Sequence, residues 1–211
     1  MRIAPLIPPA LCLLVGFLMG SLPFCVWLPR RLCKVDVCAR SSDGNPGTAN
    51  VFTLCGVPLG ILCLLLELGK GIVPLLCAKV WLTPGSLWFT GAMAAPVLGH
   101  ALGLLHHRHG GKCIAVSFGV LLALLPQDPV VLFLAIPYIL FSTLIRIREH
   151  RIRSLIAFAA FGVGAFLWEW RCGVCTVAAG CVLIALIVMY RHKKPAESPL
   201  PVPTPDLSAE Q

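Results

Sequence analysis

Charged side chains are scarce in this sequence and make up only 12% of its 211 residues. Soluble domains usually carry about twice that fraction, so the shortage argues against a soluble fold. The chain instead contains recurring apolar runs of about 17–25 residues, the length at which a helix crosses a bilayer. The sequence therefore predicts an all-α integral membrane protein, one compact helical bundle without a soluble domain.

Aromatic residues are also few, at 8%, and they are not interleaved with the basic runs. Single-stranded nucleic acid is bound by cations together with stacking aromatic rings, so the net charge of +8 does not indicate a nucleic-acid partner. Basic residues of membrane proteins collect in cytoplasmic loops, and we attribute the excess to topology.

A complete set of metal ligands is missing as well. Eleven cysteines are present, but Cys172 and Cys175 form the only close pair, and neither a second pair nor two histidines complete a zinc set. Cysteines within apolar runs behave as small hydrophobic residues. No metal site is predicted.

Seven apolar segments are predicted to cross the membrane, at residues 3–28, 51–82, 87–105, 113–125, 130–145, 154–167 and 172–190. The first is longer than the roughly 7–15-residue core of a cleavable signal. Within it, Gly16, Gly20 and Ser21 suit close helix packing, and Pro23 should kink the helix.

The second segment is interrupted by Glu67-Leu68-Gly69-Lys70-Gly71. Charges in an apolar run are costly in lipid unless they face protein or a water-filled cavity. We expect one broken helix there; two short helices joined by a surface turn are the alternative.

The distribution of Lys and Arg predicts the orientation of the bundle. With the N-terminus outside and the C-terminus cytoplasmic, 13 of the 17 basic residues fall in cytoplasmic segments, namely Arg30, Arg31, Lys34, Arg40, Arg108, Lys112, Arg146, Arg148, Arg151, Arg153, Arg191, Lys193 and Lys194. We expect a membrane domain at 1–194 and a disordered cytoplasmic tail at 195–211, rich in Pro, Ser and Glu.

The segment 41–50, Ser-Ser-Asp-Gly-Asn-Pro-Gly-Thr-Ala-Asn, is the most polar stretch between two apolar segments. Its backbone N–H groups and its Ser, Asn and Thr side chains have the chemistry of a phosphate cradle. An ordinary turn between helices is the other interpretation. The predicted topology places this segment on the cytoplasmic side with 100–112, 146–153 and 191–194, so that cations, imidazoles and glycine N–H groups face one leaflet. A phosphate ester is the expected ligand, although the charges alone would also follow from positive-inside topology.

The histidines divide into two groups. His106, His107 and His109 are interpreted as a solvated loop, whereas His100 follows a glycine at the end of a span and could orient a substrate or act as a base.

Five short motifs occur in a characteristic order: 20–24 (Gly-Ser-Leu-Pro-Phe), 44–51 (Gly-Asn-Pro-Gly-Thr-Ala-Asn-Val), 69–71 (Gly-Lys-Gly), 99–100 (Gly-His), and 110–112 (Gly-Gly-Lys) followed by Ser117 and Gly119. This order resembles the bacterial acyl-phosphate:glycerol-3-phosphate acyltransferase family, from about residue 20 to residue 126, with a weaker similarity at 191–193. The resemblance implies a seven-helix enzyme of the cell membrane whose active site faces the cytoplasm.

The activity implied by this resemblance is transfer of a fatty acyl group from acyl phosphate to glycerol 3-phosphate, giving lysophosphatidic acid and phosphate. No metal or other cofactor is implied, and a separate soluble enzyme supplies the acyl phosphate. The implied catalytic residues are Lys70, His100 and Lys112. The implied substrate-binding residues are Ser42, Asp43, Gly44, Asn45, Gly47, Asn50, Gly110, Gly111, Ser117 and His192.

The sequence also departs from the family pattern. Asp43 stands where the family has serine, Thr53 where it has arginine, Cys113 where it has glycine and Pro195 where it has asparagine. An arginine-rich stretch at 146–153 replaces a serine-rich one, with Ser154 as the remaining match. An impaired homologue that binds acyl phosphate or the donor-making enzyme and regulates lipid synthesis is therefore the alternative function. A small transporter is a third, although the internal repeats typical of transporters are absent.

Overall fold

The computed structural model describes residues 9–105 and 110–193, all of whose regular elements are helices. In chain order these are α1 (Pro9–Gly20), α2 (Phe24–Leu32), α3 (Val37–Arg40), α4 (Thr48–Cys55), α5 (Val57–Trp81), α6 (Leu87–Leu102), α7 (Ile114–Leu122), α8 (Val131–Thr143), α9 (His150–Cys172) and α10 (Cys175–Lys193). The predicted loop histidines His106, His107 and His109 and the predicted tail at 195–211 lie outside the described residues.

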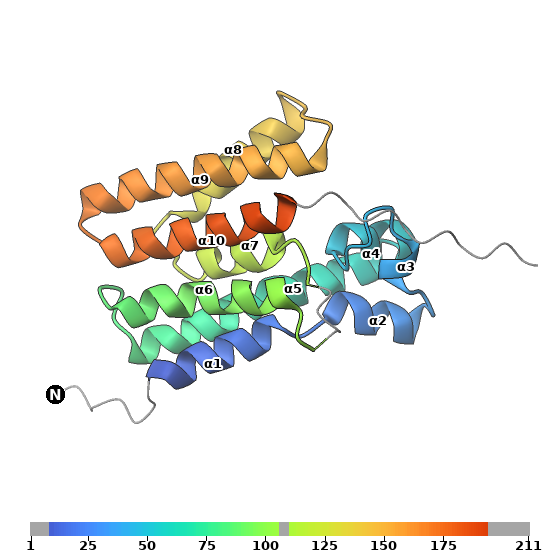
Figure 1. Cartoon of the computed structure of the whole chain (residues 1–211), viewed down its shortest axis with the longest axis horizontal. Coiled ribbons are helices and arrows are strands. Elements are labelled where there is room, and N and C mark those ends of the chain that lie inside the picture. Colours follow the sequence, from blue (N-terminus) through green and yellow to red (C-terminus); the bar gives the residue numbers. More distant parts are fainter. Residues whose placement is uncertain (1–8, 106–109, 194–211) are drawn as a thin grey trace, which may run out of the picture.

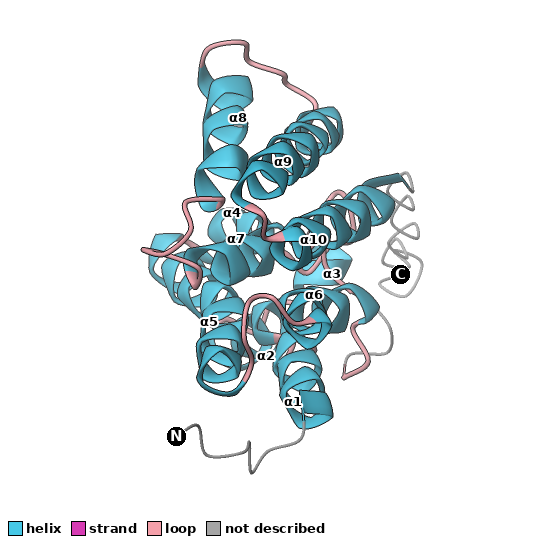
Figure 2. Ribbon diagram, turned by 90° about the vertical axis from the view of Figure 1, so that its left-hand side faces the viewer, coloured by secondary structure: helices cyan, strands magenta, loops and turns pink. Residues whose placement is uncertain are grey.

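The long helices run side by side, and the short helices α2, α3 and α4 lie together at one end of the bundle (Figure 1). In the view turned by 90°, α8 and α9 lie on one side of the molecule and α1 lies on the opposite side (Figure 2). In between, α10 packs against both α9 and α6, while α5 packs against α7. A single buried cluster that includes Phe89, Met93, Phe158 and Phe161 joins these layers.

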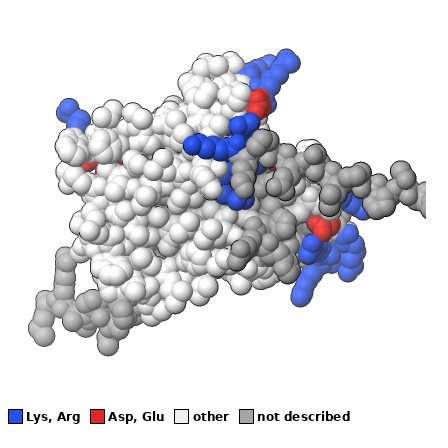
Figure 3. Space-filling view, in the orientation of Figure 1, with Lys and Arg blue, Asp and Glu red and all other residues white. Residues whose placement is uncertain are grey.

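Four segments are long and apolar enough to cross a membrane: Pro9–Leu32, Val57–Trp81, His150–Cys172 and Cys175–Lys193. The helices Leu87–Leu102 and Val131–Thr143 are shorter but also apolar. The prediction of an all-helical integral membrane protein is thereby confirmed in its coarse form. Most Lys and Arg visible in the space-filling view gather at the end of the bundle that carries α2–α4 and the α8–α9 connection (Figure 3).

The predicted kink in the first segment is confirmed, because the helix is interrupted between Gly20 and Phe24. The predicted close packing is found there too. A Cβ atom on Gly20 would collide with the main chain of Pro96, and one on Gly99 would collide with the carbonyl of Phe17. Only glycine lets the backbones of α1 and α6 approach so closely.

The prediction of a break at 67–71 is wrong. Helix α5 continues through these residues from Val57 to Trp81, and the chain changes direction at Gly56, which has a φ of +85°. The predicted single segment 51–82 is therefore divided into α4 and α5. The helix tolerates its charges because Glu67 and Lys70 point into protein, with 2% and 1% exposure. Gly71 lies on the same inward side, against the main chain of α7.

Candidate active site

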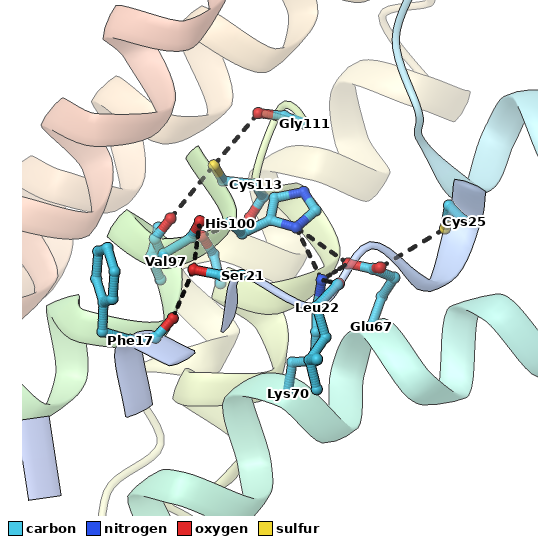
Figure 4. A network of polar contacts seen from close by, with 12 residues as sticks. Phe17, Ser21, Leu22, Cys25, Glu67, Lys70, Val97, His100, Gly111 and Cys113 are labelled. Carbon is cyan, nitrogen blue, oxygen red and sulfur yellow. Dashed lines mark hydrogen bonds and ion pairs between the residues drawn. The ribbon is translucent and has the colours of Figure 1, made fainter. Parts of the chain in front are cut away.

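A buried lysine is the centre of the polar network in the bundle. Lys70 Nζ lies 2.8 Å from the carbonyl oxygen of Leu22, 2.9 Å from His100 Nδ1 and 2.8 Å from Glu67 Oε2. An ammonium group has three N–H donors and no acceptor. All three donors of Lys70 are therefore used, by groups that come from the α1–α2 break, α5 and α6 (Figure 4).

Each partner of Lys70 is available for a local reason. Glu67 and Lys70 are three residues apart, so helix α5 presents them on one face. The interruption after Gly20 leaves the Leu22 carbonyl outside a continuous helical ladder, where it can accept from the ammonium. Cys25 adds a weak S–H contact of 3.7 Å to the second carboxylate oxygen of Glu67.

The contact with Lys70 determines which nitrogen of His100 carries the proton. Because the ammonium can only donate, Nδ1 must accept, and a neutral imidazole then carries its hydrogen on Nε2. Glu67 Oε2 is farther from Nδ1, at 3.3 Å. The Nε2 side of the ring faces Gly111, where a Cβ atom would collide with it. His100 is thus arranged as a hydrogen-bond donor toward the glycine segment.

The segment Gly110-Gly111-Lys112 is fastened on two sides. The Gly111 N–H donates to the carbonyl of His100 over 3.2 Å. The Arg191 guanidinium donates to the carbonyl oxygens of both glycines, and its Nε lies 3.2 Å from that of Gly111. Lys112 then reaches across to Asp43, with 2.5 Å between Nζ and Oδ2. The predicted site elements at 41–50, at His100, at 110–112 and at 191–192 are therefore brought to one end of the bundle.

The hydrogen-bond donors of the 41–50 turn converge on the Asp43 carboxylate. Its Oδ1 accepts from the Asn45 N–H at 3.2 Å and from Asn50 Nδ2 at 2.8 Å, while Lys112 donates to Oδ2. Gly44 adopts the left-handed conformation, with a φ of +61°. The aspartate therefore caps the turn, and an internal anion occupies the expected phosphate cradle.

These contacts also set the protonation of Asp43. Its partial burial by itself would raise the pKa of the carboxyl group, but the hydrogen bonds from Lys112 and Asn50 and the charge of Lys112 outweigh burial. The pKa of Asp43 is consequently held below its ordinary value of 3.8. The ion pair with Lys112 is intact at neutral pH.

A small cavity of about 20 Å³ lies between these groups and is lined by Ser21, Leu22, Pro23, Cys25, Val26, Pro46, Glu67, His100, Gly103 and Gly111. A buried water needs about 10–15 Å³, so this space is the size of one water and smaller than a phosphate ester. Among the described residues, no three His, Cys, Asp or Glu side chains come together as metal ligands.

The other predicted site residues occupy varied positions. Ser42 is exposed on the turn, and Gly47 is the residue before α4. Ser117 is fully buried in α7 and donates to the carbonyl oxygen of Cys113, the residue before that helix, at 2.8 Å, so the structure does not bring its hydroxyl to the cavity. His192 is 2% exposed, and its Nδ1 bonds the Val188 carbonyl oxygen at 2.8 Å. Roles for these residues stay predictions.

Two members of the network were not predicted as site residues. Glu67 had a usable signal, since an acidic residue three positions before a lysine in an apolar run indicates a buried pair. Arg191 was predicted only as part of the basic segment 191–194; its contacts with Gly110 and Gly111 join segments 80 residues apart, which the sequence does not reveal.

Comparison with known proteins gives consistent results. The family model described as glycerol-3-phosphate acyltransferase matches residues 10–198. The glycerol-3-phosphate acyltransferase of Pseudomonas paraeruginosa is 36% identical over 180 residues, which cover 85% of this chain and 89% of that protein. The crystal structure of PlsY (YgiH), an integral membrane glycerol 3-phosphate acyltransferase, is similar in its glycerol 3-phosphate form with a TM-score of 0.73 and 28% identity, covering 87% of this chain and 88% of that chain. Its lysophosphatidic acid form gives a TM-score of 0.71 and 26% identity, covering 88% of each chain.

Proposed function

This chain belongs to the glycerol-3-phosphate acyltransferase family, and from that premise we propose that its acyl donor is an acyl phosphate. It is a membrane enzyme that acylates glycerol 3-phosphate and forms lysophosphatidic acid. With this donor, an ester bond forms between the acceptor oxygen and the acyl carbon, and the bond from that carbon to the phosphate oxygen breaks. Inorganic phosphate leaves and takes up the proton that the acceptor hydroxyl loses.

The observation that carries this proposal is the convergence of the 41–50 turn, His100 and the Gly110–Lys112 segment beside one cavity. An acyl phosphate is already activated, so the enzyme needs no covalent nucleophile. It has to hold two anions close together, orient one hydroxyl and stabilise the oxyanion. Cations and fixed N–H donors supply those functions.

We assign the roles accordingly. Lys112 leaves Asp43 to bind the phosphate of the acceptor, and Asp43 accepts a hydrogen bond from a glycerol hydroxyl. The turn residues Ser42, Gly44, Asn45, Gly47 and Asn50, together with Gly110, Gly111 and His192, form the substrate-binding surface, and Ser117 supports the Gly110–Lys112 segment from within α7 through its hydrogen bond to Cys113. His100 donates from Nε2 to the developing oxyanion.

Lys70 is a positioning residue in this proposal, because all of its N–H groups are already bonded. It fixes the tautomer and the direction of His100, and Glu67 supplies its counter-charge at a site with almost no solvent contact. Of Lys70 and His100, His100 is then the residue that contacts the reacting atoms.

We further propose seven crossings, made by α1, α5, α6, α7, α8, α9 and α10, with the N-terminus outside and the active site facing the cytoplasm of a multi-pass cell-membrane protein. The gathering of Lys and Arg at the end that carries the 41–50 turn supports this orientation (Figure 3). Helix α7 has nine residues, about 14 Å at 1.5 Å per residue, so its flanking segments must complete that crossing. A soluble enzyme that makes acyl phosphate is the expected partner.

The test is an assay of purified protein with palmitoyl phosphate and glycerol 3-phosphate, with lysophosphatidic acid as the readout. Product that depends on both substrates is expected. A folded protein that binds palmitoyl phosphate without forming product would instead be the impaired, regulatory homologue. Palmitoyl-CoA in place of palmitoyl phosphate tests the donor, and equal rates with both would contradict the proposed one.

A further inference from the structure

The carbonyl oxygen of Gly111 accepts hydrogen bonds from two side chains. Arg191 Nε donates to it over 3.2 Å from the last turn of α10, and the same guanidinium donates to the carbonyl oxygen of Gly110. The Cys113 thiol lies 3.5 Å from the Gly111 oxygen. A carbonyl oxygen has two lone pairs, so the guanidinium and the thiol can bind it together.

Cys113 is held in an unusual conformation. Its φ of +65° lies in the left-handed region, which favours glycine, and the family pattern has glycine at this position. The thiol also lies 3.6 Å from the carbonyl oxygen of Val97 in α6, and the side chain is 1% exposed (Figure 4). A strained residue persists where its surroundings fix it. Cys113 therefore links Gly111 to α6, a contact that glycine could not make.

These contacts orient the peptide group between Gly111 and Lys112. In a trans peptide the C=O and N–H bonds point in opposite directions. The Gly111 carbonyl points toward Arg191 and Cys113, so the Lys112 N–H points away from them. Among the described residues no acceptor is found for this N–H, whereas the preceding N–H, that of Gly111, donates to His100. The Lys112 N–H is thus an oriented donor that the fold itself does not use.

This donor belongs to the residue whose side chain reaches Asp43. Lys112 Nζ lies 2.5 Å from Asp43 Oδ2, in the place assigned to the phosphate of the acceptor. A phosphate has several acceptor oxygens, and main-chain N–H groups combine with cations in binding it. A main-chain N–H and an ammonium on one residue match that requirement, provided that the peptide cannot rotate.

We propose that Arg191 and Cys113 are positioning residues, which together fix the Gly111–Lys112 peptide so that its N–H donates to the phosphate of the acceptor. This inference rests on the proposed function and deepens it. Neither side chain touches the substrate in this arrangement. Arg191 acts from α10, and Cys113 acts from the residue before α7, so the peptide is held by two elements that are distant in the sequence.

The role of Arg191 is tested with Arg191→Lys and Arg191→Gln, and Lys193→Gln is the control because Lys193 is an exposed cation on the same helix end. Lysine keeps the charge but loses the planar fork that binds two carbonyl groups. One hydrogen bond changes affinity by up to about tenfold, so the KM for glycerol 3-phosphate should rise by about that factor in both Arg191 variants. It should stay unchanged in Lys193→Gln. Wild-type behaviour of Arg191→Lys would overturn the assignment, because the charge alone would then suffice.

The role of Cys113 is tested with Cys113→Ala and Cys113→Ser, which both keep a side chain in the left-handed conformation. Only serine restores a donor. Cys113→Ala should raise the KM for glycerol 3-phosphate severalfold, Cys113→Ser should restore most of the loss, and the KM for palmitoyl phosphate should stay unchanged in both. A lower Tm with an unchanged KM for glycerol 3-phosphate would show a purely structural role and would contradict the proposal.

The double variant Arg191→Lys with Cys113→Ala tests whether the two residues act on one peptide. Residues that share a partner are not additive, so the rise in KM for glycerol 3-phosphate should be smaller than the product of the two separate rises. A rise equal to that product would mean that they act independently. Calorimetric titration with glycerol 3-phosphate measures the same differences as Kd, without turnover. A wild type that forms no product would therefore contradict the proposed function, whereas equal Kd values in all variants would contradict only the positioning.

Discussion

Lys112 Nζ lies 2.5 Å from Asp43 Oδ2 and joins two segments that are 69 residues apart in the sequence. Both side chains are about a quarter exposed, so the charge attraction by itself contributes little to folding. Asp43 also accepts from Asn45 and Asn50, whereas Lys112 has this one side-chain contact among the described residues. The two partners are therefore unequal in their effect on stability.

Asp43→Ala should accordingly destabilise the protein more than Lys112→Ala. The aspartate loses an ion pair and two hydrogen bonds, which together contribute about 1–3 kcal/mol. The lysine loses only the pair, worth about 0–1 kcal/mol. Thermal unfolding in detergent measures the difference, and equal shifts in Tm would show that the turn does not depend on the Asp43 carboxylate. In the activity assay Lys112→Ala should be the more damaging change.

The pH dependence of this pair has a definite sign. Because the pKa of Asp43 is below 3.8 in the folded protein, ionised Asp43 stabilises the fold. That contribution is fully present above pH 3.8 and is lost as the pH falls through the lowered pKa. We expect the Tm difference between wild type and Asp43→Asn to stay constant down to about pH 5 and to shrink progressively as the pH falls below 3.8. A difference that grows in acid would contradict the direction of the shift.

Glu67 and Lys70 should behave as a unit. Glu67→Gln leaves the buried ammonium without a counter-charge, which typically costs about 3–5 kcal/mol. Replacing both, as Glu67→Gln with Lys70→Met, removes the uncompensated charge and should restore most of the lost Tm. Turnover should stay low in the double variant because nothing then directs His100. Recovery of turnover together with Tm would show that Lys70 serves only folding.

The proposed tautomer of His100 predicts different outcomes for its two amide replacements. The side-chain nitrogen of glutamine can take the place of Nε2, and that of asparagine the place of Nδ1. His100→Gln should therefore retain more activity than His100→Asn. Loss of one oxyanion donor costs about 10²–10³ in kcat, the fall expected for His100→Asn. The reverse order would indicate that Nδ1 is the functional atom.

Orientation is testable with the native cysteines. Cys33 follows α2 at one end of the bundle, and Cys172 and Cys175 flank the α9–α10 turn at the other; all three are exposed. A membrane-impermeant maleimide should label a Cys33-only variant in inside-out vesicles and a Cys175-only variant in right-side-out vesicles. A Cys181-only variant should stay unlabelled in both because that thiol is buried. Labelling of Cys33 and Cys175 from the same side would contradict an odd number of crossings between them.

Much of the fold could be predicted because it follows from local chemistry. Pro23 predicted the interruption in the first segment, and Gly16, Gly20 and Ser21 predicted its close packing. The break expected at 67–71 did not occur, since the cost of a charge in lipid depends on the direction of its side chain. Glu67 and Lys70 point inward, and their partners come from segments 30–48 residues away, which spacing within α5 does not reveal.

The candidate site, like the fold, could be predicted from the sequence only in part. The motifs predicted that the 41–50 turn, His100 and the Gly110–Lys112 segment would be close. They did not predict that Asp43 would fill the cradle, because pairing with Lys112 is a long-range contact. Nor did they predict the contacts of Arg191 with Gly110 and Gly111, which depend on where α10 ends.

The crossing of α1 and α6 has a consequence for how precisely the reaction centre is built. Leu22 lies two residues after Gly20 and His100 one residue after Gly99, and these two glycines are where the backbones of α1 and α6 touch; both Leu22 and His100 are partners of Lys70. A slip of α1 by one helical turn, about 5.4 Å, would carry the Leu22 carbonyl out of reach of the ammonium. The relative positions of the reacting groups are thus fixed within the apolar part of the molecule, by two glycines that lack a side chain. A larger side chain at either glycine should therefore lower turnover first, although neither glycine lies in a polar loop.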